Sequence, residues 1–361
     1  MQTPANAQDR EEIDVASLGP QVGEQIPDFA LPDQNGTVQT LESIMGEEGA
    51  MIVFHRSADW CPYCKAQLVE LQERFTELQA QGLGIAAISY DTEEVLADFA
   101  QRRGISDVPL LSDDDSAVIR AFGIYNHVAE EGIGDNKDDA AVRADVEKYV
   151  SVFGANPMIV GTPFPGTFVV DRDGRVTSRF FEEFYRERNT AANIMLKLGA
   201  PLSGISGSTG ETSHLDIAAS QSNPDITVGS RFHLALDITP KPNMHVYAPG
   251  AAELGYRVID VQLDTPDFIR ALPIQYPPSE SYYFEPLDER ADVFMQPFQL
   301  IQEIVVGGSP EAAEQLAQID VLTLTGRLDY QACDDKVCFN PVSVPLTWTL
   351  TVNQLDRERA R

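Results

Sequence analysis

Short apolar runs alternate with amphipathic stretches along the first half of the chain. Residues 50–55 (AMIVFH) form an apolar run typical of a buried strand. Further strands are predicted at 84–91 (GIAAISYD) and at the segment VPLLSD. The segments GTFVVDRDG and RVTSRFF meet at an Asp-Gly turn, which predicts a hairpin.

Helical spacing appears between these runs. Residues 62–81 carry apolar side chains on one face, at Leu68, Leu71, Phe75 and Leu78. A second helix is predicted to open at Asp91, with Glu94 three residues on in a capping-box arrangement. Another is predicted over about 187–198. Strands and helices that alternate in this way predict an α/β sheet with helices on both faces.

The pattern changes after residue 200. Residues 201–225 are rich in Ser, Gly, Thr and Ala, which predicts a domain linker. Beyond it, apolar residues recur with period two, for example over 232–238 and 342–352, and predict an antiparallel β-sandwich. The predicted organisation is therefore an N-terminal tail (1–20), an α/β domain (21–200), the linker, an all-β domain (226–352) and a C-terminal tail (353–361).

Composition and charge disfavour some classes of function. The 361 residues carry 56 acidic and 26 basic side chains, a net charge of -30, which disfavours nucleic-acid binding. No apolar run approaches the roughly 18 residues of a membrane-spanning helix. The first 15 residues have no apolar core of a signal peptide, although Ala5-Asn6-Ala7 resembles the small-residue end of a secretory cleavage site. We leave the localisation open, with an extracytoplasmic one favoured.

The segment Trp60-Cys61-Pro62-Tyr63-Cys64 lies between a predicted strand and a predicted helix. Unpaired N–H groups at a helix N-terminus favour thiolate, the nucleophile in disulfide exchange. We therefore expect Cys61 to be the exposed nucleophile and Cys64 the buried resolving thiol. The alternative is half of a zinc site, but zinc takes about four ligands and no matching CxxC exists.

Residues from about 21 to 200 resemble the thioredoxin fold, closest to its AhpC/TSA (peroxiredoxin-like) and TlpA-like branches. The segments GEQIPDFALPDQNG, RSADWCPYCKAQLVEL and PFPGTFVVDRDG carry the resemblance. It implies an active site at Trp60, Cys61 and Cys64, with Pro165 in the place of the family's cis-proline.

Two differences from the family patterns bear on which branch of the fold this chain resembles. Peroxiredoxins carry Pro seven residues and Thr three residues before the peroxidatic Cys, where this chain has Phe54 and Ala58. A dithiol exchange enzyme therefore fits better than a dedicated thiol peroxidase, which remains the alternative. Thioredoxins place a buried acid where this chain has His55. Either His55 exchanges the proton of Cys64, since imidazole titrates near neutral pH, or it is a packed histidine.

Cys333 and Cys338 form a second close pair, at a turn between predicted strands. Taken alone, the spacing favours a structural disulfide. Residues from about 226 to 352 resemble the amino-terminal, immunoglobulin-like domain of DsbD-type reductases, and YQACDDKVC matches its redox-active pair. The resemblance implies an aromatic cap, for which Tyr283 and Phe284 are candidates, although simple packing is the alternative.

The expected fold class is thus a thioredoxin-fold α/β domain followed by an immunoglobulin-like sandwich. The expected partners are protein thiols and disulfides, with peroxide as the alternative substrate. Because no membrane-embedded part is present, the resemblance implies a separate electron donor, thioredoxin-like or a membrane thiol reductase. No cofactor or metal is expected, since Met244 and His245 lack further copper ligands at suitable spacing.

Overall fold

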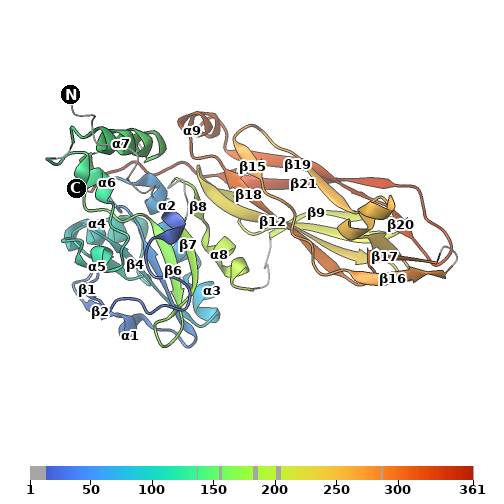
Figure 1. Cartoon of the computed structure of the whole chain (residues 1–361), viewed down its shortest axis with the longest axis horizontal. Coiled ribbons are helices and arrows are strands. Elements are labelled where there is room, and N and C mark those ends of the chain that lie inside the picture. The colour runs from blue at the N-terminus through green and yellow to red at the C-terminus, as the bar shows by residue number, and fades with distance from the viewer. Residues whose placement is uncertain are drawn as a thin grey trace, which may run out of the picture. The chain divides into compact units, whose positions relative to one another are not determined.

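The computed structural model describes residues 14–135, 137–153, 157–181, 186–200, 205–285 and 288–360. The chain divides into two compact units, with boundaries at Ala200/Pro201 and Gln354/Leu355. The segment Leu355–Arg361 belongs to the first unit (Figure 1). The residues of the suspected cleavage site, Ala5 to Ala7, lie outside the described part of the chain.

A five-stranded sheet of order β5-β4-β3-β6-β7 organises the first unit. Its central strand, β3, is buried at all six positions, which explains the continuous apolar run in the sequence. Strands β4 and β5 extend the sheet in parallel, and β6 and β7 add an antiparallel hairpin. The bounds are β3 (Gly49–Phe54), β4 (Leu83–Ser89), β5 (Leu110–Ser112), β6 (Gly166–Val170) and β7 (Val176–Phe181).

Helices cover both faces of this sheet, as predicted. One core joins side chains of α2, α3, α4 and α8 to the sheet. The other joins α5 and the N-terminal segment to the opposite face. The helices are α1 (Leu41–Ile44), α2 (Pro62–Glu73), α3 (Phe75–Ala80), α4 (Glu93–Arg103), α5 (Ala117–Ala121), α6 (His127–Glu131), α7 (Ala140–Phe153) and α8 (Ala191–Lys197), and a small hairpin joins β1 (Ala30–Pro32) to β2 (Val38–Thr40).

Two helix predictions need correction. The helix expected over 62–81 is interrupted at Arg74, whose backbone dihedrals (φ -99°, ψ 9°) leave the helical region. Phe75 nevertheless packs against the same core as Leu68. Helix α4 begins at Glu93 with Thr92 as N-cap, one residue later than expected. The Asp91 side chain is not a cap, because its carboxylate is hydrogen-bonded elsewhere.

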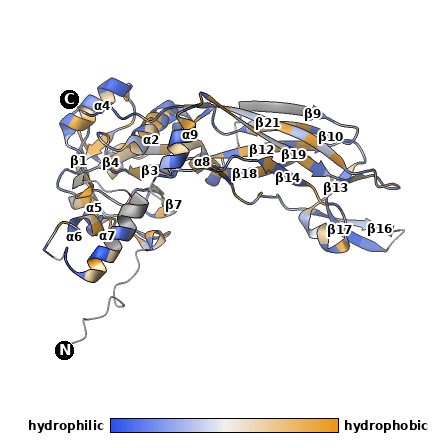
Figure 2. Cartoon of the chain, turned by 90° about the horizontal axis from the view of Figure 1, so that it is seen from above, coloured by the Kyte–Doolittle hydropathy of each residue, from blue (hydrophilic) through white to orange (hydrophobic). Residues whose placement is uncertain are grey.

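The second unit is β-rich, as predicted. One sheet has the order β15-β18-β12-β10-β9, and another the order β11-β21-β19-β14. Alternate residues of β21 are buried, from Val344 to Val352. Figure 2 shows hydrophobic and hydrophilic residues interspersed along β12, β19 and β21. The bounds are β9 (Ile205–Glu211), β10 (Leu215–Gln221), β11 (Asp225–Ile226), β12 (Ser230–Pro240), β14 (Asp260–Asp264), β15 (Ile269–Ala271), β18 (Phe298–Val306), β19 (Val321–Tyr330) and β21 (Val342–Val352). The α-helix α9 (Pro310–Leu316) lies in the same unit.

A smaller sheet of order β16-β17-β13-β20 carries Cys333, to which Cys338 is joined by an isolated bridge. Its strands are β16 (Glu280–Phe284), β17 (Glu289–Phe294), β13 (His245–Tyr247) and β20 (Ala332–Cys333). The sheets establish a β-rich class, and the finer immunoglobulin-like assignment stays a prediction.

The linker predicted at 201–225 is wrong over its described residues. This segment forms β9 and β10 of the second unit, and β10 pairs with β12 from Leu215 to Gln221. Leu215, Ile217 and Ala219 point into the core while the residues between them are exposed. Because small residues occupy many positions of this segment, the sequence analysis did not recognise the period-two pattern of a strand. Residues 201–204 lie outside the described part.

Candidate redox site

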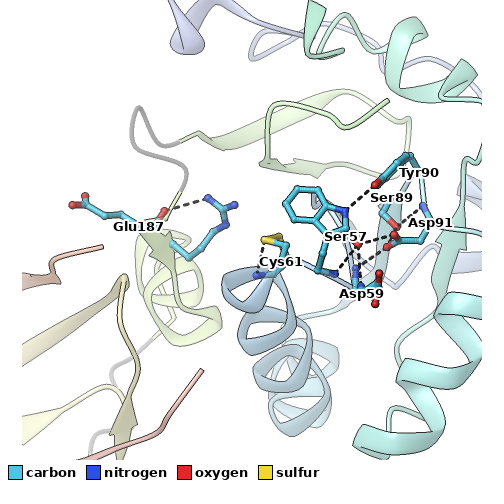
Figure 3. The surroundings of a disulfide bond; sticks show 11 residues. Ser57, Asp59, Cys61, Ser89, Tyr90, Asp91 and Glu187 are labelled. Atoms are coloured by element: carbon cyan, nitrogen blue, oxygen red, sulfur yellow. Dashed lines mark hydrogen bonds between the residues drawn. A yellow bond between two sulfur atoms is a disulfide. The ribbon is translucent and has the colours of Figure 1, made fainter. Parts of the chain in front are cut away.

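The segment WCPYC forms the start of α2, as the sequence predicts. Cys61 is the N-cap of the helix, and its Sγ accepts a hydrogen bond from the Cys64 N–H at 3.3 Å. Pro62 occupies the first helical turn, where its missing N–H costs no intrahelical bond. Cys61 and Cys64 form a disulfide with Cα atoms 5.3 Å apart (Figure 3). The pair thus lies at the positive end of the helix dipole.

Both cysteines are buried, which corrects the expectation of an exposed nucleophile. Cys61 is 1% exposed and Cys64 is 0% exposed. The physical reason is local: the Cys61 side chain turns inward to cap the helix and to bond the Cys64 sulfur. In the oxidised form, both cysteines are therefore buried from solvent.

The buried carboxylate of Asp91 holds the turn before Cys61 through hydrogen bonds. Asp91, which follows β4, accepts hydrogen bonds from the Ser57 hydroxyl at 2.7 Å and the Ala58 N–H at 2.6 Å. The Ser89 hydroxyl donates to the same carboxylate at 2.9 Å. Figure 3 shows Ser57, Ser89 and Asp91 gathered beside Cys61. Burial raises the Asp91 pKa to about 6, although these three hydrogen bonds act in the opposite direction.

Trp60 is fixed by its side chain. Its indole N–H donates to the Tyr90 hydroxyl at 2.8 Å, and that hydroxyl donates to the Met158 carbonyl at 2.8 Å. The Arg56 guanidinium lies over the indole, 4.7 Å from the ring centre. Burial raises the pKa of Tyr90 to about 12, so the phenol remains protonated. Trp60 is thereby immobilised next to Cys61.

His55 follows β3 and is fully buried. Burial, and secondarily the charge of Arg188, lowers the pKa of His55 to about 3. Neither ring nitrogen has a hydrogen-bond partner among the described residues. The imidazole is therefore neutral at pH 7, and the titration near neutrality that suggested proton exchange with Cys64 is absent. A proton-transfer role for His55 stays a prediction that this environment disfavours.

Pro165 precedes β6 and lines a small pocket together with Gln67 of α2 and Arg188. Its peptide bond is trans, because no cis bond occurs among the described residues. The cis geometry implied by the family resemblance is therefore corrected. The chain is extended here, since Pro163 bridges Tyr125 and Phe164 donates its N–H to the Ile124 carbonyl at 2.7 Å. These backbone contacts hold the chain just before Pro165, whose peptide bond is trans.

The C-terminal segment is part of this site, which the sequence did not predict. Asp59, two residues before Cys61, accepts hydrogen bonds from the Arg359 side chain at 2.8 Å and the Ala360 N–H at 2.6 Å. The Lys65 ammonium of α2 donates to the Glu358 carbonyl. Alternating charges in residues 356–359 were the available signal, but they do not identify partners so distant in sequence.

Cys333 and Cys338 form the second disulfide, with Cα atoms 4.0 Å apart. The Tyr247 hydroxyl lies 3.3 Å from the Cys333 sulfur and 3.4 Å from that of Cys338. Cys333 is buried at 1% exposure, whereas Cys338 is exposed. The two residues of this disulfide thus differ in their exposure to solvent. Burial raises the pKa of Tyr247 above its ordinary value, which keeps the hydroxyl protonated beside the sulfurs.

The aromatic side chains around this disulfide differ from those expected. Tyr247 and Tyr282 pack in one cluster with Cys333. Tyr283 is 43% exposed and donates a hydrogen bond to Asp288 at 2.9 Å. Phe284 is half-buried at the end of β16, outside that cluster. A shielding role for Tyr283 or Phe284 stays a prediction. Tyr247 was missed because it is distant in sequence from the pair, and Tyr282 because the sequence does not show which side chains of β16 face the disulfide.

Among the described residues, no three His, Cys, Asp or Glu side chains converge as a metal site. No helix in that part of the chain is long and apolar enough to cross a membrane.

Comparison with known proteins relates the first unit to one family. Residues 22–179 match the AhpC/TSA family. Peroxiredoxin Bcp of Escherichia coli K12 is 33% identical over 103 residues, which are 28% of this chain and 64% of that protein. Alkyl hydroperoxide reductase E of Mycobacterium bovis is 29% identical over 163 residues, covering 45% of this chain and 84% of that protein.

Among solved structures, peroxidoxin BcpB of Mycobacterium tuberculosis matches with 24% identity and a TM-score of 0.35, over 46% of this chain and 89% of that one. The chain spans less than two thirds of the E. coli relative, and the matched family region ends before the second unit. The first unit has a thioredoxin fold, and its residues 22–179 are similar to the AhpC/TSA, peroxiredoxin-like family.

Proposed function

We propose that the first unit is a thiol–disulfide oxidoreductase that uses Cys61 and Cys64. The observation that carries this proposal is the Cys61–Cys64 disulfide at the N-terminus of α2. Once the pair is reduced, the helix N-terminus stabilises a thiolate at Cys61, whose sulfur accepts the Cys64 N–H in the oxidised form. A stabilised thiolate next to a second thiol is the arrangement that disulfide exchange requires.

In the proposed reaction, the Cys61 thiolate attacks one sulfur of a substrate disulfide. A mixed disulfide forms, and the other substrate sulfur leaves as a thiolate that takes a proton. The Cys64 thiolate then attacks the Cys61 sulfur and releases the second substrate thiol. Two electrons pass to the substrate, and the protein is left with the Cys61–Cys64 disulfide.

A thiol peroxidase is the second candidate, and the peroxiredoxin relatives favour it. In that reaction the Cys61 thiolate attacks the peroxide O–O bond, which gives a sulfenic acid and releases water or an alcohol. Cys64 then condenses with the sulfenic acid and releases water. The site lacks a hydroxyl at position 58, and the adjacent Ser57 hydroxyl is already bonded to Asp91. We therefore place disulfide exchange first.

Stopped-flow rates of the fully reduced protein separate the two candidates. We expect a disulfide substrate to oxidise Cys61 and Cys64 faster than hydrogen peroxide does at equal concentration. The peroxide rate should stay near that of an ordinary thiolate. A peroxide rate that exceeds the disulfide rate by orders of magnitude would make the peroxidase the function.

We further propose that Cys333 and Cys338 exchange electrons with a separate donor and with the first pair. The exposure of Cys338, beside the buried Cys333, supports exchange over a purely structural disulfide. The resemblance of the second unit to the amino-terminal domain of DsbD-type reductases supports the same proposal. A thioredoxin-like protein or a membrane thiol reductase would be a donor of the required chemistry.

Variants of the second pair test this proposal. Because only Cys338 is exposed, Cys333→Ser should form a mixed disulfide with a small aromatic disulfide readily, and Cys338→Ser should react at least about tenfold more slowly. Peptide mass spectrometry identifies the modified cysteine. Equal rates would contradict the predicted direction of attack. Unchanged turnover of the whole protein after both Cys333 and Cys338 are replaced would contradict electron exchange between the two pairs.

A further inference from the structure

The Asp91 carboxylate connects the end of β4 to the turn that leads into the redox helix. It is 6% exposed, and both of its oxygens accept hydrogen bonds from that turn. Oδ1 accepts from the Ser57 hydroxyl and Oδ2 from the Ala58 N–H, at 2.7 and 2.6 Å. Asp91 itself is held by the Ser112 hydroxyl, which donates to its carbonyl at 2.8 Å.

The same network reaches the residues that precede Cys61. The Ser57 oxygen, after donating to Asp91, accepts the N–H groups of Asp59 at 2.9 Å and Trp60 at 3.3 Å. Tyr90, the neighbour of Asp91, accepts the Trp60 indole N–H. Tyr90 and Asp91, which follow β4, therefore hold the Trp60 side chain and the backbone of the 57–60 turn next to Cys61 (Figure 3).

Ionisation of Asp91 changes what this network can do. A carboxylate accepts at both oxygens, whereas a neutral acid must turn one oxygen into a donor. The donated proton would then point at a group that already donates to Asp91, which is Ser57 at Oδ1, or Ala58 and Ser89 at Oδ2. The other ionisable groups that interact with this carboxylate are Asp59 in the turn, Tyr90 beside it and Arg359 of the C-terminal segment. Burial raises the pKa of Asp91 to about 6, within the range of ordinary assays.

We propose that Asp91 is a positioning residue for the redox pair, and that its ionised form holds the 57–60 turn so that Cys61 reacts at the start of α2. This inference rests on the proposed role of Cys61 as the nucleophile. It adds that the reactivity of Cys61 depends on a carboxylate that contacts neither sulfur. When Asp91 takes up a proton, one hydrogen bond to the turn is lost and the nucleophile is less well held.

The test compares Asp91→Asn with Asp113→Asn in the reduced full-length protein. Asp113 is a matched control, because it is 1% exposed, follows β5, and accepts backbone N–H bonds from Val118 and Ile119 of α5. Among the described residues, the Asp113 carboxylate makes no hydrogen bond to the 57–60 turn. The readout is the iodoacetamide alkylation rate of Cys61 from pH 4.5 to 8, resolved by peptide mass spectrometry, with thermal unfolding of each variant measured alongside.

We expect Asp91→Asn to alkylate about tenfold more slowly than the parent above pH 6, as for one lost charge-assisted hydrogen bond. The two rates should converge below pH 6, where both side chains are neutral. Asp113→Asn should follow the parent at every pH, whatever its loss of stability. A faster Asp91→Asn protein would show an electrostatic effect of the lost charge and overturn the proposal. So would equal rates, or the same change in Asp113→Asn.

Alkylation needs no substrate, so it separates this inference from the proposed function. If the protein turns over no disulfide but Asp91→Asn shows the predicted profile, the proposed function fails and the positioning role stands. If disulfide turnover occurs and the profile is unchanged, only the positioning role fails.

Discussion

Replacing Cys61 with Ser should lower disulfide reductase activity by about a thousandfold or more, the loss typical of a removed nucleophile. The serine hydroxyl still occupies the N-cap of α2 and accepts the same N–H, so the helix should remain folded. What is lost is the thiolate, which a hydroxyl at neutral pH does not replace. The measurement is steady-state reduction of a disulfide substrate, with circular dichroism as the control for folding.

The matched variant is Cys64→Ser, which removes only the resolving thiol. We expect it to keep the first step and to accumulate a mixed disulfide at Cys61, detectable as an added mass on that peptide. Turnover should be lost in both variants, but only Cys64→Ser should trap the substrate. A trapped adduct at Cys64 in the Cys61→Ser protein, at a comparable rate, would exchange the assigned roles of the two cysteines.

Replacing His55 with Gln should change the pH dependence of stability. The His55 pKa is lowered from 6.5 in the unfolded chain to about 3 in the folded protein. Between these values the unfolded chain binds the proton and the folded protein does not, so acidification weakens the parent. The Gln variant lacks this loss. Its unfolding free energy, relative to the parent, should rise by about 1.4 kcal/mol for each pH unit below 6.5.

Asp91 supplies a control of opposite sign. Its pKa is raised from 3.8 to about 6, so between these values the folded protein holds the proton and acidification stabilises it. Asp91→Asn should therefore lose stability relative to the parent as the pH falls from 6 to 4. Denaturant unfolding at a series of pH values measures both differences. Parallel curves for His55→Gln and the parent would contradict a buried neutral histidine.

Much of the fold was readable because it depends on local patterns. The β3 strand is apolar at every position, since it is the centre of a sheet covered on both faces. Alternation along β21 likewise reports one buried face. Strand β10 was not predicted because Ala and Ser fill several of its positions, and a segment rich in small residues has the composition of a linker.

The candidate site was predictable in its cysteines and not in their surroundings. The spacing of Cys61 and Cys64 before an amphipathic helix identifies the pair. Asp91, in contrast, has a local pattern that favours a helix cap, and only the parallel pairing of β3 and β4 brings it beneath the 57–60 turn. Tyr247 lies 86 residues before Cys333, so its contact with both sulfurs follows from the folded sheet alone.

The most direct test of the central claim is a glutathione redox titration of the whole protein, with thiols trapped and read by peptide mass spectrometry. We predict that Cys61 and Cys64 pass reversibly between dithiol and disulfide as the ratio of reduced to oxidised glutathione changes. If the reduction potential of Cys333 and Cys338 lies within about 30 mV of that of Cys61 and Cys64, the equilibrium constant between the pairs is within about tenfold of one. Electron exchange between the two pairs is then also permitted. If Cys61–Cys64 instead remains a disulfide at every ratio, the pair is structural and the proposed function is wrong.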